Sequence, residues 1–188
     1  PPTGLMANPN PICLGETVSL GVDLSTGVTY TWSASSTDAG LVSSTTESTT
    51  MTPLAAGTYT ISVFLTSAGC SSSPVSIEVE VEPGPNTPTN ANISSTDPTA
   101  CATDDGTITI SGYNPGETYT VNFEFNGLLQ TDDITASVTG DLVITSLFAG
   151  TYSNFTLINS NGCSSGVFAG PVTLTDPGSP LPPANLTA

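Results

Sequence analysis

The sequence contains no lysine, no arginine and no histidine. Its 188 residues include 16 aspartates and glutamates, which gives a formal net charge of −16. A protein that binds nucleic acid neutralises phosphates with lysine or arginine, so the composition excludes that class. Anionic membrane surfaces repel such a chain for the same electrostatic reason.

The missing basic residues also remove most catalytic machinery. Ser-His-Asp and Cys-His systems require an imidazole, and Schiff-base chemistry requires a lysine. Zinc sites with histidine ligands are impossible, and the four cysteines show no CxxC spacing. A pair of carboxylates can hydrolyse glycosides, but no acid pair stands out here. We therefore expect a protein that is not an enzyme and that has no cofactor, calcium excepted.

Long apolar runs are also missing, because none approaches the roughly 20 residues of a membrane-spanning helix. We therefore expect no membrane insertion. The chain begins with Pro1 rather than methionine, from which we expect a processed or excised segment. Four cysteines in a chain rich in serine and threonine indicate two disulfides and an oxidising compartment. The expected location is extracellular, as a secreted protein at the cell surface.

Two short strings occur twice. Ala-Gly-Thr-Tyr stands at 56–59 and again at 149–152, and Gly-Cys-Ser-Ser stands at 69–72 and again at 162–165. Both strings recur at an offset of 93 residues, whereas Cys101 follows Cys13 by 88. A repeat of this size indicates two copies of one domain. The expected domains are 1–84 and 85–178, joined through a proline-rich linker at 83–89, with 179–188 as a second linker or the start of a further repeat.

Each copy consists of short runs that alternate with period two, rich in valine and threonine, which favour strands. Such runs at regular spacing are typical of a sandwich. The predicted fold is all-β: two tandem immunoglobulin-like β-sandwich domains, each with one disulfide. The runs lie at 17–22, 28–32, 59–63 and 75–81 in the first copy and at 107–110, 119–125, 142–144 and 172–174 in the second.

Three aromatic residues are the expected structural core. Trp32 is the single tryptophan and lies in the middle of a predicted strand. Tyr59 and Tyr152 each follow a Gly-Thr pair and suit a tyrosine corner, in which the hydroxyl binds upstream backbone. Four cysteines allow three pairings. Because each copy should fold alone, we expect disulfides between Cys13 and Cys70 and between Cys101 and Cys163.

These motifs resemble a known family. Ala-Gly-Thr-Tyr followed by Asn-Gly-Cys-Ser-Ser at 161–165 resembles the tandem repeats of bacterial gliding-motility-associated surface adhesins, as does the segment from Cys101 through 105–110. The first copy, with Tyr-Thr-Trp at 30–32, resembles the PKD-like immunoglobulin modules of the same giant secreted proteins. The resemblance implies an extracellular location, tandem arrays and adhesion, and it supplies no catalytic residues.

Two functions remain open at this point. One is a structural or adhesive module in the stalk of a tandem-repeat cell-surface adhesin. The other is a subunit of a self-assembling extracellular filament that docks by strand addition of a terminal segment. The expected partners are neighbouring repeats or copies of the chain itself, with glycans or surfaces as further ligands of an adhesin.

Two acidic pairs are candidate calcium ligands, since calcium binds six to eight carboxylate and carbonyl oxygens. They are Asp104 with Asp105, followed by Gly106, and Asp132 with Asp133. Both pairs occur in contexts that favour turns, so the alternative is plain turn chemistry. Neither string matches the spaced acidic loop of an EF-hand.

Overall fold

The computed structural model describes residues 1–177, and the chain divides into two compact units, Pro1–Gly84 and Pro85–Ala188. Apart from one 3-10 turn, the described elements are strands, as the period-two runs predicted. In residues 1–177 no helix is long and apolar enough to span a membrane. The predicted terminal segment 179–188 lies outside the described residues.

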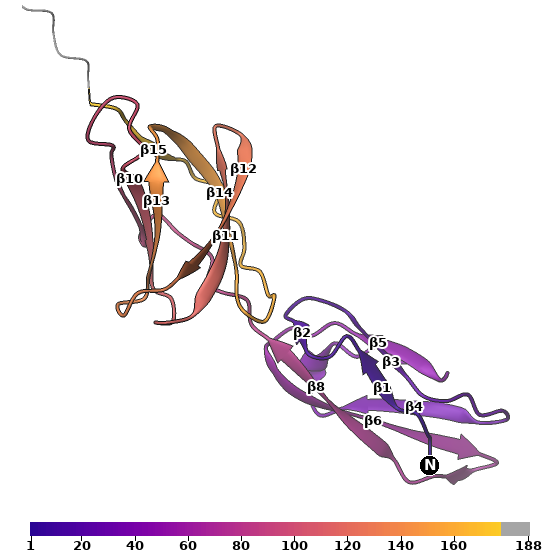
Figure 1. Ribbon diagram of the computed structural model, residues 1–188. Coiled ribbons are helices and arrows are strands. Elements are labelled where there is room, and N and C mark those ends of the chain that lie inside the picture. The colour runs from indigo at the N-terminus through magenta and orange to yellow at the C-terminus, as the bar shows by residue number, and fades with distance from the viewer. Residues whose placement is uncertain (178–188) are drawn as a thin grey trace, which may run out of the picture. The chain divides into compact units, whose positions relative to one another are not determined.

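The first unit is a sandwich of two sheets (Figure 1). One sheet has the order β1-β3-β5, and the other has the order β2-β8-β6-β4 with the short strand β7 also paired to β6. The elements are β1 (Met6–Asn8), β2 (Ile12–Cys13), β3 (Val18–Gly21), β4 (Thr29–Ala34), the 3-10 helix η1 (Thr37–Ala39), β5 (Ser48–Met51), β6 (Gly57–Ser67), β7 (Cys70–Ser71) and β8 (Val75–Glu82).

Alternation along the strands builds the core of this unit. In β4, the side chains of Tyr30 and Trp32 are buried while their neighbours are exposed or half-buried. The indole of Trp32 donates a hydrogen bond from Nε1 to the carbonyl of Thr46 at 3.0 Å, which satisfies its polar atom inside the sandwich. Aliphatic side chains fill the rest of the space, among them Val18, Leu20, Met51, Ile61, Val63, Val79 and Val81.

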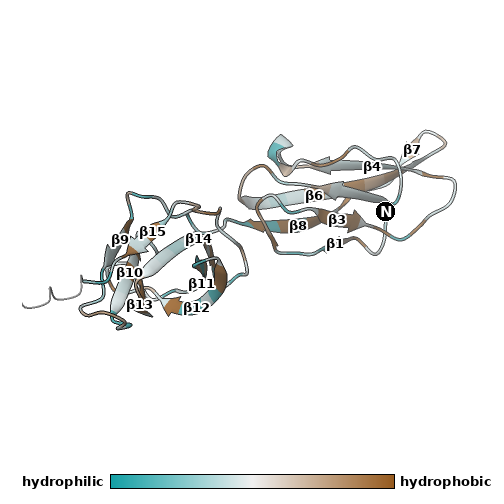
Figure 2. Ribbon diagram, turned by 90° about the horizontal axis from the view of Figure 1, so that it is seen from above, coloured by the Kyte–Doolittle hydropathy of each residue, from teal (hydrophilic) through white to brown (hydrophobic). Residues whose placement is uncertain are grey.

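The second unit is also a sandwich, with one sheet ordered β13-β10-β9 and the other β12-β11-β14-β15 (Figure 1). Its strands are β9 (Ile93–Thr96), β10 (Gly106–Ser111), β11 (Thr118–Phe125), β12 (Leu128–Thr135), β13 (Asp141–Leu147), β14 (Gly150–Ile158) and β15 (Val172–Leu174). Strand β12 lies at a sheet edge, and Figure 2 shows hydrophobic and hydrophilic residues following one another along it.

Aromatic rings dominate the second core. The Phe123 ring lies over Phe155, with centroids 5.8 Å apart, and also meets Tyr152 at 6.0 Å. Tyr152 stacks in turn on Phe125 at 4.8 Å, and Phe155 meets Phe168 at 6.2 Å. Ring pairs of this kind contribute roughly 0.5–1.5 kcal/mol beyond the area they bury.

Both units contain the same corner between their sheets. Tyr59 donates from its hydroxyl to the carbonyl of Ala55 at 2.8 Å, and Tyr152 donates to the carbonyl of Phe148 at 2.8 Å. Each bond reaches four residues back along the chain, and both rings are buried. The repeated Ala-Gly-Thr-Tyr string therefore forms the same local structure twice.

Part of the predicted linker belongs to the second unit. Asn86 accepts a hydrogen bond at its carbonyl from the hydroxyl of Tyr113 at 3.0 Å, and Thr87 accepts one at Oγ1 from the backbone of Gly166 at 3.0 Å. Pro88 is buried. The spacer between the units is therefore shorter than 83–89.

Candidate functional site

The cysteines of the first unit lie at opposite ends of its sandwich. Cys13 in β2 pairs with Glu82, the last residue of β8, where the chain leaves the unit. Cys70 in β7 pairs with Ser67, the last residue of β6. The N-terminal residues lie at this second end, because Thr3 accepts a hydrogen bond from Asp23, whose carbonyl in turn binds the hydroxyl of Tyr30 near the start of β4. We call the end with the N-terminal residues the leading end and the other the trailing end.

The second unit repeats this placement. Cys163 lies in the loop after β14, where Ser164 bridges to Ile158, and Gly166 of the same segment binds Thr87 at the leading end. Cys101 lies near the point where the chain leaves the unit, because its thiol donates to the carbonyl of Pro177 at 3.0 Å. Each unit thus has one leading-end cysteine, Cys70 or Cys163, and one trailing-end cysteine, Cys13 or Cys101.

The predicted pairing of Cys13 with Cys70 and of Cys101 with Cys163 is wrong for this structure. Cys13 and Cys163 are disulfide-bonded, whereas Cys70 and Cys101 are free thiols on the surface. The 11 residues of β6 separate the two cysteines of the first unit, a span of roughly 33 Å. The 9 residues of β14 separate those of the second by roughly 26 Å. A disulfide needs Cα atoms within about 7 Å, so neither pair can join inside its own unit.

The loop that carries Cys101 is held by one carboxylate. Asp105 accepts hydrogen bonds from the backbone nitrogen of Thr99 at 2.9 Å, from the Thr99 hydroxyl, and from the Thr103 hydroxyl at 2.7 Å. The Thr99 and Thr103 bonds lower the pKa of Asp105 to about 2, against a small opposing effect of burial. These hydrogen bonds fit the turn role that was the alternative to calcium.

Hydrogen bonds from a carboxylate residue also hold the trailing-end cysteine of the first unit. The Glu16 carboxylate accepts a hydrogen bond from the backbone nitrogen of Cys13 at 3.1 Å, and the Glu16 nitrogen donates to the Cys13 carbonyl at 3.0 Å. In both units an acid a few residues downstream therefore orders the loop of the trailing-end cysteine.

The sequence context of the second acidic pair had suggested a turn, but the pair lies in a strand. Asp132 and Asp133 are inside β12, opposite Val121 and Thr120 of β11. Neighbouring strand residues point to opposite faces of a sheet, so the two carboxylates cannot converge on one ion. Asp133 instead accepts a hydrogen bond from the Thr120 hydroxyl at 2.6 Å. Among residues 1–177 no group of three or more acids, cysteines or histidines is placed to hold a metal ion, and calcium binding stays a prediction.

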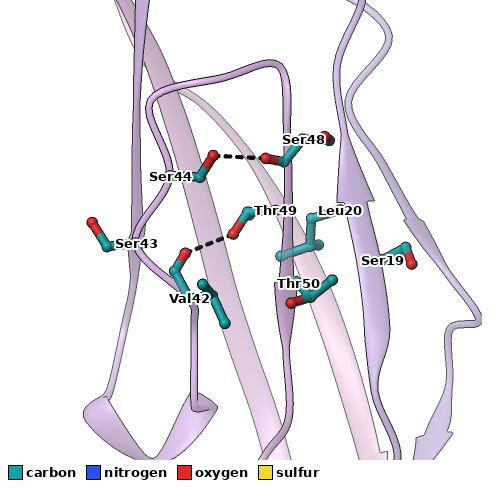
Figure 3. A pocket seen from close by; sticks show the side chains of 8 residues that line it. All are labelled: Ser19, Leu20, Val42, Ser43, Ser44, Ser48, Thr49 and Thr50. Atoms are coloured by element: carbon teal, nitrogen blue, oxygen red, sulfur yellow. Dashed lines mark hydrogen bonds between the residues drawn. The ribbon is translucent and has the colours of Figure 1, made fainter.

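A shallow hollow of about 340 Å³ opens on the first unit and is lined largely by hydroxyls (Figure 3). Ser44 donates to the carbonyl of Ser48 at 2.8 Å, and Thr49 donates to the carbonyl of Val42 at 2.6 Å. These side chains brace the loop before β5. None of the eight residues that line this hollow has an ionisable side chain that could activate a hydroxyl as a nucleophile.

An aromatic hollow of about 320 Å³ opens on the second unit. It is lined by Phe123, Phe125 and Tyr152, with the half-exposed Phe148 at its side. The sequence did not single out this surface, because its residues come from four strands and a turn that only the fold brings together.

The first unit matches a known domain family. Residues 1–83 match the family described as Ig-like domain, CHU_C associated. No curated protein matches the chain. The prediction of an all-β, immunoglobulin-like sandwich is therefore confirmed, while the narrower resemblance to gliding-motility adhesins goes beyond what this match shows.

A solved structure supports the same fold. The chain is similar to the C-terminal 282-residue fragment of intimin, which was solved in complex with the intimin-binding domain of the translocated intimin receptor. The identity is 14%, the match covers 93% of this chain and 64% of that one, and the TM-score is 0.57. It is also similar to the chicken CNTN1 FN1–FN3 domains, with 9% identity, 92% and 66% coverage and a TM-score of 0.44. The chain thus spans about two thirds of the length of each.

One sequence signal bears on the intradomain disulfide of the first unit. The strand that begins at Gly57 has to be long to reach the Gly69-Cys70 turn, so Tyr59 and Cys70 lie near its opposite ends. A partner for Cys70 within its own unit would therefore have to lie at the leading end. Nothing local to Cys13 shows which end it occupies, because that depends on its parallel pairing with β8.

Proposed function

We propose that the chain is a segment of the stalk of a tandem-repeat extracellular adhesin, and that it acts as a structural or adhesive module without catalysis. Immunoglobulin-like and fibronectin-like domains are in general binding or structural modules, and the half-cystines Cys13 and Cys163 fit an oxidising compartment. The absence of any imidazole or lysine supports the non-catalytic role.

The observation that carries the proposal is the path of the chain through each unit. Domain termini are often close together. In the first unit, by contrast, the N-terminal residues lie at the leading end and Glu82 lies at the trailing end. In the second, Asn86 and Thr87 lie at the leading end, and Pro177 lies beside Cys101 at the trailing end. When the chain enters a unit at one end and leaves it at the other, the unit can add its own length to a stalk.

Immunogold labelling of intact source cells tests this function. An antibody against the purified chain should label unpermeabilised cells, with gold on thin projections of the surface. Trypsin provides a matched control, because it cleaves after lysine and arginine and finds no site in these 188 residues. A brief trypsin treatment should therefore release the segment without cutting inside it. Labelling that requires permeabilisation would contradict the proposal.

A filament subunit is the second candidate, and the open edge of β12 favours it. This strand is eight residues long, pairs on one side with β11, and exposes Leu128 and Leu129. A strand from another copy could add to this edge. Asp132 and Asp133 place charge on the same edge, which discourages such pairing. Sedimentation velocity under reducing conditions separates the candidates, since strand addition predicts assembly that grows with concentration and persists without disulfides.

A further inference from the structure

The four cysteines form two classes that follow the internal repeat. Cys70 and Cys163 occupy the repeated Gly-Cys-Ser-Ser string and lie at leading ends. Cys13 and Cys101 come first in each copy and lie at trailing ends. The half-cystines of the structure are one trailing-end residue, Cys13, and one leading-end residue, Cys163. The free thiols are the other member of each class, Cys70 and Cys101.

Both free thiols are in ordered and accessible positions. Cys101 is exposed, and its loop is held through the Asp105 carboxylate. Cys70 is exposed and paired with Ser67 across a tight hairpin turn. Hydrogen bonds also order the loops of their repeat equivalents, since the Glu16 carboxylate accepts from the backbone of Cys13 at 3.1 Å and the Asn159 side chain accepts from the backbone of Cys163 at 2.9 Å. Each free thiol therefore stands at the repeat-equivalent position of a cysteine that is oxidised.

We propose that Cys101 of one copy of this chain forms a disulfide with Cys70 of a second copy, joined head to tail. The proposal rests on the function proposed above, in which modules follow one another in a line. A low-molecular-weight disulfide such as glutathione disulfide is the oxidant. Two thiols give up two protons and two electrons to form the new S–S bond, and the oxidant is reduced to two thiols.

The two classes of cysteine explain why the bond is expected between a trailing-end and a leading-end cysteine. Cys101 and Cys70 stand in different loops at opposite ends of their units, so a contact between them is heterologous and does not close on itself. Such a contact propagates, because each added copy brings both a new Cys101 and a new Cys70. Random collision of exposed thiols would instead give Cys70–Cys70 and Cys101–Cys101 links as readily as mixed ones.

Two single variants provide the test. The variants Cys70→Ser and Cys101→Ser each keep one free thiol. Both positions are exposed, so we expect the fold to stay intact, which Trp32 fluorescence checks for the first unit and hydrogen exchange in β14 for the second. Each variant alone and an equimolar mixture are incubated with a glutathione redox buffer and run on a non-reducing gel. We expect the mixture to form disulfide-linked dimer about tenfold faster than either variant alone, a preference of about 1.4 kcal/mol for unlike ends.

The unmodified chain should give a ladder of disulfide-linked multimers, which dithiothreitol should reduce to monomers. The double variant Cys70→Ser/Cys101→Ser should form no multimers. Peptide mapping with chymotrypsin should find Cys70 joined to Cys101. Dimers that form equally fast in the single variants, or a mixture that stays monomeric, would overturn the proposal. The cell-surface labelling test is independent of this one. If the cells are labelled but the mixture of variants forms no dimer, only the proposed disulfide between copies is contradicted. If the mixture forms dimer but the cells are not labelled, only the proposed stalk function is contradicted.

Discussion

Between β4 and β6 the first unit forms the 3-10 helix η1 and the short strand β5, whereas the second unit, between β11 and β14, forms the eight-residue strand β12 and then β13. The cores differ as well: the first is mostly aliphatic around Trp32, and the second is built on stacked rings around Phe123 and Phe155. The tyrosine corner and the end cysteines are nevertheless the same in both.

The two units differ along the sides of their sandwiches and agree at the ends. The sides of the sandwich accept different strands and different core residues, because any well-packed apolar set of the right volume gives a stable interior. The ends keep their cysteines and their direction of entry and exit. The sides of the two sandwiches are therefore the part that differs, and the ends are the part that the units share.

The largest expected effect probes the difference between the two cores. Phe155→Ala removes a fully buried ring that stacks on Phe123, and it should lower the free energy of unfolding of the second unit by about 4 kcal/mol. Ile61→Ala in the first unit should cost about 3 kcal/mol. Hydrogen exchange in β14 reports the first change, and Trp32 fluorescence during urea unfolding reports the second.

The conservative variants Phe155→Leu and Ile61→Val are the matched controls and should cost much less. A loss below about 1 kcal/mol for Phe155→Ala would contradict the idea that stacked rings hold the second core.

A smaller effect tests two glycines that allow close backbone contacts in different units. A Cβ on Gly40 would lie 2.0 Å from the carbonyl oxygen of Thr52, and one on Gly140 would lie 2.3 Å from that of Tyr113, both at positive φ. Gly40→Ala and Gly140→Ala should each cost about 3 kcal/mol, from the left-handed backbone together with the clash.

Gly27 and Gly116 also have positive φ but face open space, so they isolate the backbone contribution. Their alanine variants should cost only about 1 kcal/mol in urea titrations. Equal losses at all four positions would show that the carbonyl contacts do not matter.

The tyrosine corner should respond equally in the two units. Tyr59→Phe and Tyr152→Phe each remove one hydrogen bond of 2.8 Å and should each cost about 1 kcal/mol. Thermal unfolding of both variants provides the measurement. A loss confined to one unit would break the claim that this corner is a shared element.

The smallest effect concerns the stability of the second unit at acidic pH. The hydrogen bonds from Thr99 and Thr103 lower the pKa of Asp105 from 3.8 to about 2. A lowered pKa stabilises the folded state above the unfolded value, and this stability is lost as the pH falls from about 4 to about 2. Asp105→Asn should therefore be less stable than the unmodified chain at pH 6, with a difference that shrinks towards pH 2.

Asp104→Asn is the control, since it removes the same charge but none of the three hydrogen bonds that Asp105 accepts. Circular dichroism melts between pH 6 and pH 2 give the comparison. A pH-independent difference for Asp105→Asn would contradict the role of its carboxylate in the loop.

Much of the fold was predictable because its signals are local. Period-two alternation gave strands such as 28–32 and 59–63, and the structure has β4 and β6 there. The string Ala-Gly-Thr-Tyr at 56–59 and 149–152 predicted a tyrosine corner in each copy, and both hydrogen bonds are there. Each of these depends on neighbours along the chain and needs no knowledge of which strands pair.

What only the tertiary structure decided depends on register and on sheet order. The ends at which Cys13 and Cys101 lie follow from the pairing of β2 with β8 and from the contact with Pro177. The position of Asp132 and Asp133 inside a strand rather than in a turn follows from the pairing of β12 with β11. Residues far apart in sequence meet or separate according to which strands pair, and the side-chain pattern within one segment shows which face is buried but not which distant strand is its neighbour.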